Sequence, residues 1–226
     1  DTAGVTWGGG ETQSLPGVLL PGVLEFAGSA FGVIQPKERL VRGENIQAGD
    51  VIVLVEASGV HANGISLVRE IAGQLPDGYQ TKLPDGTMFG ETALTPTHLY
   101  ARVVQSLFDA GIAIHYLSNI TGHGWRKIMR ATVDFTYRMH EIPPAPGIFD
   151  FIAKHAGNDE KEMYGNFNMG AGYALYIPAD QADQAQQIVS SCGFKAWLAG
   201  TVEAGPKQVI IEPKNITFEG KSLEVR

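Results

Sequence analysis

Short apolar runs, separated by polar and glycine-containing connections, predict a chain in which strands and helices alternate irregularly. Runs rich in β-branched and aromatic residues are typical of buried strands. They cover residues 23–34, 51–56, 112–117, 135–139, 170–178, 196–202 and 209–212. Because several of these strands follow one another without a helix between them, the pattern favours an α+β fold, with a mixed sheet flanked by helices, over a regular Rossmann order.

Helical periodicity and cap residues appear between these runs. The apolar positions within residues 65–71 share roughly one face of a helix that Asn63 would cap. Thr95 before Pro96 predicts the start of a second helix, and Asp180 predicts the start of a third. Further helical segments are expected over residues 125–131, 147–157 and 160–168.

A polar connection that ends in Gly49-Asp50 predicts a domain boundary near residue 45. Residues 1–45 precede that boundary, and residues 46–226 contain most of the predicted elements. The tail, residues 215–226, is polar and is expected to be loosely attached to the rest.

Composition and charge exclude several classes of protein. Hydrophobic residues make up 44% of the 226 residues, enough for a sizeable core. The formal net charge of −7 argues against a general nucleic-acid or anionic-membrane binder. Cys192 is the single cysteine, so no disulfide framework or cysteine-rich zinc site is expected. No apolar run reaches the length of a membrane span and no signal-peptide pattern is present, which favours a reducing cytoplasm.

Glycine, at 28 residues, is nearly twice as frequent as the usual share of about 7% and draws attention to loops. The connection from Ser58 to Gly64 places a hydroxyl, the imidazole of His61 and an amide between a strand and a helix. Free N–H groups at such a helix start favour an anion, and an imidazole there can exchange a proton. The alternative interpretation is that Asn63 only caps the helix and that His61 is an exposed loop residue.

Two further loops have a similar composition. Residues 121–124 follow a predicted strand with a hydroxyl and two glycines, and ligands of α/β sheets gather at the carboxyl ends of strands. Residues 8–12 add a flexible loop with a carboxylate, Glu11, that could help to hold a magnesium ion. The residues alone favour a hinge or a disordered terminus over metal binding for this third loop.

The remaining reactive side chains are interpreted as structural or as surface residues. His115 lies in a predicted strand, and Cys192 is expected to be a small core residue. The histidines are not spaced as metal ligands, so no metal-binding residue is predicted. The histidines expected on the surface are His98, His140 and His155, and the aromatic residues expected to pack are Phe167, Tyr173 and Tyr176.

Taken together, these segments resemble a known family. The sequence contains GGET, then SGVHANGISLVR, PTHLY, ITGHG and EMYGNFNMGAGY, in this order over residues 4–212. This series resembles aminoimidazole ribonucleotide (AIR) synthetase, the phosphoribosylformylglycinamidine cyclo-ligase. The resemblance implies an ATP-dependent ring closure in purine biosynthesis, with ATP and Mg²⁺, a nucleotide substrate and a homodimer. It also implies that residues 1–45 are the end of an N-terminal domain and residues 46–226 a C-terminal domain.

The resemblance assigns roles to individual residues. The catalytic candidates are His61 and Asn63. The residues expected to bind substrate or phosphate are Ser58, Gly59, Gly64, Thr121, Gly122 and His123. Those expected to bind the nucleotide cofactor are Gly9, Gly10, Glu11 and Thr12. The family's later Phe-Asn-x-Gly corresponds to Phe167, Asn168 and Gly170.

Two departures from the family pattern are expected to matter. Asn119 replaces a histidine and His123 replaces a glycine, which changes how closely the backbone can approach a phosphate. The family's ATP-binding lysine loop and aspartates, which come before GGET, have no counterpart here, so this chain alone is expected to be inactive. Two alternatives stay open: another ATP-using reaction of the same superfamily (formylglycinamidine synthase, selenophosphate synthesis, thiamine phosphate kinase or hydrogenase maturation), or a non-catalytic ligand-binding fragment.

Overall fold

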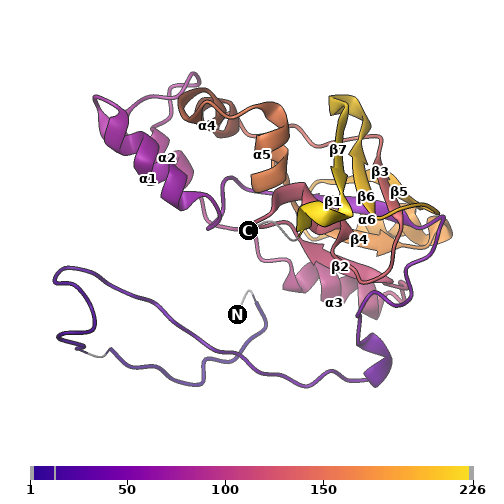
Figure 1. The fold of residues 1–226 in the computed structure, drawn as a ribbon. Coiled ribbons are helices and arrows are strands. Elements are labelled where there is room, and N and C mark those ends of the chain that lie inside the picture. Colours follow the sequence, from indigo (N-terminus) through magenta and orange to yellow (C-terminus); the bar gives the residue numbers. More distant parts are fainter. Residues whose placement is uncertain (1–2, 13, 224–226) are drawn as a thin grey trace.

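The computed structural model of the protein describes residues 3–12 and 14–223, and its centre is a seven-stranded mixed sheet (Figure 1). The spatial order of the strands is β2-β4-β1-β5-β3-β6-β7. β3 and β6 run parallel, and the other neighbouring pairs of this sheet run antiparallel. The strands are β1 (Val51–Glu56), β2 (Tyr116–Asn119), β3 (Thr136–Met139), β4 (Ala171–Ile177), β5 (Ala196–Glu203), β6 (Gln208–Ile211) and β7 (Ile216–Glu219). The predicted α+β fold with a mixed sheet is therefore confirmed.

Helices lie along the sheet and at its ends (Figure 1). The α-helices are α1 (Ile65–Gln74), α2 (Phe89–Ala93), α3 (Ala101–Asp109), α4 (Ile148–Ala156), α5 (Glu160–Asn166) and α6 (Ala182–Ser191). The short 3-10 turns are Lys37–Arg39, Gly78–Gln80, Gly124–Met129, Ala179–Gln181, Glu212–Lys214 and Gly220–Leu223. None of the described helices is both long and apolar enough to span a bilayer.

The central strand β1 shows why the sheet is buried on both faces. Ile52 and Leu54 point into a large core that includes residues of α1, α4 and α5, whereas Val53 and Val55 point into a second core with α3 and α6. Because side chains alternate along a strand, burial of both faces requires a continuous apolar run rather than an alternating one. The sequence VIVLVE satisfies this requirement.

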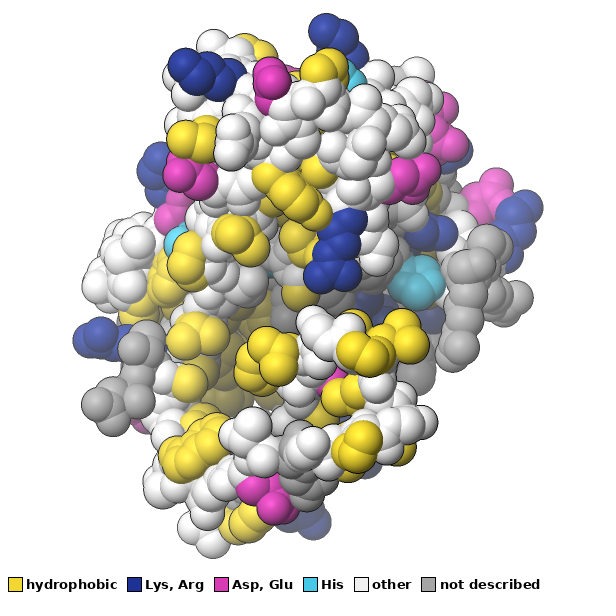
Figure 2. Space-filling model, turned by 90° about the vertical axis from the view of Figure 1, so that its left-hand side faces the viewer, with side chains coloured by type: hydrophobic (Ala, Val, Ile, Leu, Met, Phe, Trp, Pro, Cys, Tyr) yellow, Lys and Arg dark blue, Asp and Glu magenta, His cyan; other side chains and the backbone are white. Residues whose placement is uncertain are grey.

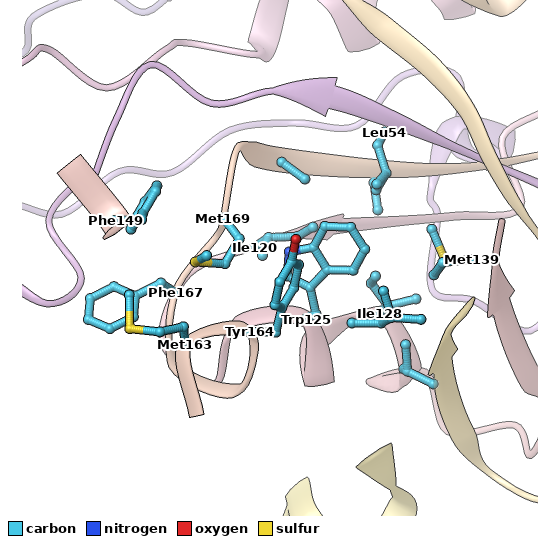
Figure 3. Close-up of a cluster of buried hydrophobic side chains, with 14 of the residues drawn as sticks. Leu54, Ile120, Trp125, Ile128, Met139, Phe149, Met163, Tyr164, Phe167 and Met169 are labelled. Carbon is cyan, nitrogen blue, oxygen red and sulfur yellow. The ribbon is translucent and has the colours of Figure 1, made fainter. Parts of the chain in front are cut away.

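The large core continues past the sheet into the turns that follow β2. Figure 3 shows Trp125 and Tyr164 with their rings close together, and the two ring centroids are 5.1 Å apart in an edge-to-face arrangement. Both side chains are buried, as are Phe167 and Met169 just before β4. The expectation that Phe167 is a packing residue is confirmed. This apolar cluster supports the segments that form the candidate site.

The predicted strand over residues 23–34 is wrong. The structure leaves these residues extended and without strand pairing, as part of an N-terminal arm that runs apart from the sheet (Figure 1). Phe26 is 93% exposed and Leu24 81%. Apolar pattern alone does not make a strand, because the backbone N–H and C=O groups need a neighbouring strand. Figure 2 shows hydrophobic side chains of this arm below a hollow that separates it from the rest of the surface.

Several predicted helix and strand starts are also displaced. α1 is capped by Gly64 rather than Asn63, α3 begins at Ala101 well after Thr95, and Asp180 lies in a 3-10 turn before α6. Residues 124–129 form a 3-10 helix where an α-helix was expected. The strand expected over 112–117 starts later, at β2. The contacts of the loops, and not the local cap preferences, determine where these helices begin.

Residues 215–223 of the C-terminal tail are not loosely attached, which corrects the expectation from their polarity, and residues 224–226 lie outside the described residues. β7 pairs with β6, and Ile216 and Phe218 are 6% exposed each. Thr217 and Glu219 alternate with them and face solvent. A four-residue strand with one apolar face is short enough that its two buried side chains hardly change the polarity of the segment as a whole.

The substitution Phe218→Ala tests whether the tail is part of the folded core. It should lower the free energy of unfolding by about 3 kcal/mol, because it removes a buried aromatic side chain. Thr217→Ala on the exposed face of the same strand is the matched control and should change stability little. Urea unfolding followed by circular dichroism measures both. Equal effects of the two substitutions would contradict the assignment.

Candidate functional site

The sheet brings two of the glycine-containing loops to one edge. β1 and β2 are both antiparallel to β4, which lies between them, so their carboxyl ends are on the same side. The first loop, residues 57–64, follows β1, and the second loop, residues 120–124, follows β2. A Cβ atom on Gly122 would lie 3.1 Å from Oδ1 of Asn63, so the loops are in contact. The expected convergence of these loops is present.

Asn168 joins both loops to the start of β4. Its side-chain amide donates to the carbonyl of Gly59 (2.8 Å), and its Oδ1 accepts from the N–H of Gly170 (3.0 Å). Its own carbonyl accepts from the indole N–H of Trp125 (2.8 Å). Asn168 is 3% exposed, so these groups have little access to water as an alternative partner.

His61 is buried in the first loop rather than exposed. It is 7% exposed and has a left-handed backbone conformation (φ 60°), which few non-glycine residues adopt. The main-chain N–H of Ser58 donates to its Nε2 (3.3 Å), and the Ser58 hydroxyl oxygen lies 3.2 Å from the same nitrogen. The Ser58 hydroxyl donates to the carbonyl of Pro96 (2.7 Å).

These contacts define which nitrogen of His61 is left for a ligand. In one arrangement Nε2 accepts a hydrogen bond from the main-chain N–H of Ser58. In the other, Nε2–H donates to the Ser58 hydroxyl oxygen, and the Ser58 O–H donates to the carbonyl of Pro96. In both arrangements Nε2 is occupied inside the protein. Among the described residues Nδ1 has no hydrogen-bond partner, so Nδ1 is the ring nitrogen left open to a ligand.

The surroundings favour the neutral form of His61. Burial lowers its pKa from 6.5, and the nearby His98 lowers it further. His98 is half-buried, with its ring edge-on to that of Phe194 at 5.0 Å, so the expectation that it is an exposed surface residue is wrong. The PTHLY segment therefore supplies a second imidazole beside His61.

Tyr100, at the end of the PTHLY segment, closes the site from one side. Its hydroxyl donates to the carbonyl of Glu56 at the end of β1 (2.7 Å) and its ring stacks on Tyr173. A Cβ on Gly172 would collide with that hydroxyl and would lie 3.2 Å from Cε1 of His61. Glycine at 172 is thus required for Tyr100 and His61 to lie against β4.

Asn63 and Gly64 hold the end of the first loop in place. The Asn63 amide donates to the carbonyl of Asn166 (2.6 Å), so its side chain links two segments and does not cap α1. Gly64 is in the left-handed region (φ 90°), and a Cβ there would clash with the ring of Phe167. Asn63 Oδ1 remains directed at Gly122. The catalytic assignment of Asn63 stays a prediction.

The second loop is built on tight backbone turns and a lysine. His123 and Gly124 both have positive φ values (73° and 50°), and a Cβ on Gly124 would clash with the carbonyl of Tyr164. The ammonium of Lys127 donates to the hydroxyl of Thr121 (2.7 Å). Burial lowers the pKa of Lys127, and Arg130 lowers it further.

Lys127 and His98 are the site residues that the sequence interpretation missed. Lys127 follows the second loop within WRKIMR. Its separation of six positions from Thr121 was the one feature of the sequence that could have indicated a contact with this loop. His98 stands inside PTHLY, a segment that was used for the resemblance and not for chemistry. His115, interpreted as structural, lies just before β2 and forms a hydrogen-bonded pair with the buried Asp50 (2.8 Å).

The third glycine loop does not join the other two. Gly9, Gly10, Glu11 and Thr12 are exposed on the N-terminal arm, and no hydrogen bond or ion pair in the described part of the chain links them to residues 57–64 or 120–124. Within residues 3–12 and 14–223, no group of three or more His, Cys, Asp or Glu side chains is arranged to hold a metal ion.

Comparison with known proteins assigns this fold to a class. The profile of the family described as AIR synthase related protein, C-terminal domain, matches residues 47–212. The chain belongs to this family.

Curated relatives share its sequence over most of its length. It is 32% identical to the phosphoribosylformylglycinamidine cyclo-ligase of Thermosynechococcus vestitus over 93% of this chain and 62% of that protein. It is 35% identical to the cyclo-ligase of Carboxydothermus hydrogenoformans over 90% of this chain and 60% of that protein. The chain thus spans about three fifths of the length of these curated relatives.

Solved structures share the fold at much lower identity. The hydrogenase maturation protein HypE of E. coli aligns with a TM-score of 0.52 at 15% identity, over 79% of this chain and 51% of HypE. Phosphoribosylformylglycinamidine synthase II of Thermotoga maritima aligns with a TM-score of 0.50 at 10% identity, over 82% of this chain and 27% of that protein. The AIR synthase-like fold is therefore common to proteins with different names.

Substitution of Asn168 tests its role in joining the loops. Asn168→Ala should lower the free energy of unfolding by about 1–3 kcal/mol, because the Gly59 carbonyl and the Gly170 N–H lose buried partners. Asn119→Ala, on the exposed position at the end of β2, is the control and should have little effect. Urea denaturation compares the two variants, and a similar small loss in both would show that Asn168 does not hold the site.

The lowered pKa of His61 predicts a pH dependence of stability. Its pKa is below 6.5 in the folded protein and close to 6.5 in the unfolded chain, so the unfolded state binds the proton first. The contribution of neutral His61 to the free energy of unfolding is complete above about pH 6.5 and is lost as the pH falls toward the pKa of His61 in the folded protein. His61→Gln keeps an acceptor near Ser58 but does not titrate. Its free energy of unfolding, measured by urea titration from about pH 8 to about pH 5, should therefore fall less with falling pH than that of the wild type. The exposed His155→Gln should not, and identical pH curves for wild type and His61→Gln would contradict the prediction.

Proposed function

We propose that this chain is the substrate-binding and proton-transferring part of an ATP-dependent cyclo-ligase that closes the imidazole ring of formylglycinamidine ribonucleotide. The observation that carries the proposal is the meeting of the two loops at Asn63 and Gly122, with Nδ1 of His61 free beside them. The name of the relatives that are 32–35% identical supports the reaction. In this reaction the formyl oxygen takes the γ-phosphoryl group of ATP and ADP is released. A nitrogen of the substrate then attacks the same carbon, and the oxygen leaves as phosphate.

His61 supplies the proton chemistry in this proposal. Nδ1 contacts the reacting part of the substrate, while Ser58, itself bonded to the Pro96 carbonyl, holds the opposite nitrogen and fixes the ring. When the proton of the neutral ring is on Nε2 and is donated to the Ser58 hydroxyl, Nδ1 is unprotonated and can accept a proton from the nitrogen that closes the imidazole ring of the product. Ser58, Gly59, Gly64, Thr121, Gly122 and His123 bind the substrate or its phosphate, and Asn63 positions the two loops against each other.

Binding of ATP by this chain has less direct support than the reaction itself. A HypE structure in complex with ATP has this fold, with a TM-score of 0.51 at 16% identity. The cofactor-binding residues would be Gly9, Gly10, Glu11 and Thr12 of the arm.

The side chains of residues 3–12 and 14–223 do not form a site for Mg²⁺. No carboxylate cluster is present among them, and Glu11 is not part of any such group. No step of the proposal is therefore taken through a metal ion.

The resemblance also supports a homodimer in the cytoplasm, which we include in the proposal. Among the superfamily alternatives, the cyclo-ligase is favoured by sequence. Its identity to this chain is 32–35%, against 10–16% for HypE and the formylglycinamidine synthase.

Turnover by the native protein tests the proposed reaction. The protein should form aminoimidazole ribonucleotide and ADP from formylglycinamidine ribonucleotide and ATP, followed by a colorimetric assay for the aminoimidazole and a coupled assay for ADP. Formylglycinamide ribonucleotide, in which an amide oxygen replaces the amidine nitrogen, is the control substrate and should give no ring. Conversion of neither substrate, or of the control alone, would reject the cyclo-ligase.

Variants of His61 test its role in the native protein. His61→Ala should lower kcat by about 10²-fold or more, because a positioned acid–base group is removed. His61→Asn places an amide near the position of Nδ1 but cannot exchange a proton, so it should not restore the rate. His155→Ala is the surface control. A loss below about threefold in His61→Ala would remove the proton-transfer role, and rescue by Asn would show that Nδ1 only donates a hydrogen bond.

A further inference from the structure

Lys127 contacts the second loop and Arg130 lies near Lys127, and within the described residues neither has a carboxylate partner. Neither takes part in an ion pair within the described residues, although the chain has 24 acidic and only 17 basic side chains. Lys127 is partly buried, and its ammonium donates to the Thr121 hydroxyl (2.7 Å). A cation that is partly removed from water and unpaired is a costly arrangement unless an anion compensates it.

The backbone around Lys127 directs this cation toward the loop. The buried hydroxyl of Ser118 on β2 donates to the carbonyl of Lys127 (2.9 Å), as does the N–H of Arg130 (3.1 Å). Arg126 donates its guanidinium to the carbonyls of His123, Gly165 and Ser222, so its charge is directed at main-chain carbonyls of three segments. Of the cations within residues 126–130 in the described structure, Lys127 is the one whose side chain bonds to Thr121, whereas Arg126 bonds to the carbonyl of His123.

Protection of the sheet edge is the competing explanation, because β2 is an edge strand and lysine is a common guard against pairing with other chains. Such a guard works best when its ammonium is surrounded by water. The Lys127 ammonium is instead bonded to Thr121, one residue from the point where Gly122 contacts Asn63. Its position therefore favours a ligand in the site.

We propose that Lys127, held by Thr121 and assisted by the charge of Arg130, binds the phosphate monoester of the substrate. Lys127 is then a specificity-determining residue that selects a phosphorylated ribose over a free one. A phosphate dianion would compensate both cations and would accept from Lys127 and from the N–H groups of the loop. This inference rests on the proposed function in placing the substrate, rather than ATP, against residues 120–124.

Binding to the 226-residue chain tests the proposal without turnover. Isothermal titration with ribose 5-phosphate, inorganic phosphate and ribose should give binding of the two phosphates and none of ribose. Lys127→Met should weaken ribose 5-phosphate binding by about tenfold or more, because a charged hydrogen bond is lost. Lys127→Arg should retain part of the affinity, and Lys154→Met on the exposed face of α4 should stay within about twofold of wild type. Circular dichroism establishes that each variant is folded.

The possible outcomes separate this proposal from the reaction. Loss of phosphate binding in Lys127→Met with recovery in Lys127→Arg supports it, whether or not the native protein closes the imidazole ring. Unchanged binding in Lys127→Met, equal binding of ribose and ribose 5-phosphate, or no binding of either phosphate by the wild-type chain would overturn it. Ring closure by the native protein together with unchanged binding in Lys127→Met would reject Lys127 alone and leave the cyclo-ligase in place.

Discussion

The hydrogen bonds of Asn168 are the constraint on which the site depends. One buried amide side chain connects the first loop at Gly59 to the start of β4 at Gly170, and the carbonyl of the same residue holds Trp125 after the second loop. The site consists of irregular backbone, which has no ladder of its own to satisfy its polar groups. A single residue that satisfies groups from three segments therefore determines their relative positions, and the apolar cluster around Trp125 and Tyr164 keeps water away from those bonds (Figure 3).

Much of the sheet could be predicted because its strands are short apolar runs with both faces buried. VIVLVE at β1 and the run that became β4 needed no long-range information to be identified as strands. The run at residues 23–34 has the same pattern, but strand formation depends on a neighbour, and no pattern within the run specifies one. β7 was missed for the opposite reason, since Ile216 and Phe218 are only two apolar residues in a polar tail.

The site could be predicted as loops but not as an assembly. Glycine and hydroxyl residues after strands identified residues 57–64 and 120–124, and the order of strands, which places β4 between β1 and β2, explains why they meet. The nearness of His61 and His98 depends on a contact between residues that are 37 positions apart in the sequence. The contact of Lys127 with the second loop depends on the 3-10 helix that follows this loop. Cap preferences gave a wrong role for Asn63 because its amide found a carbonyl in Asn166, which is distant in the sequence.

The strand order also makes the two walls of the site mechanically unequal. β1 has neighbours on both sides and side chains buried on both faces, so the loop with His61 is attached to an internal strand of the sheet. β2 has β4 as its one neighbour in the sheet and lies at the edge, so the loop with Thr121 is attached to a strand with lateral bonds on one side. Fewer lateral bonds mean a lower cost of local displacement. We therefore expect the loop with His61 to be the more rigid of the two, and the loop with Thr121 to take up most of any displacement at the site.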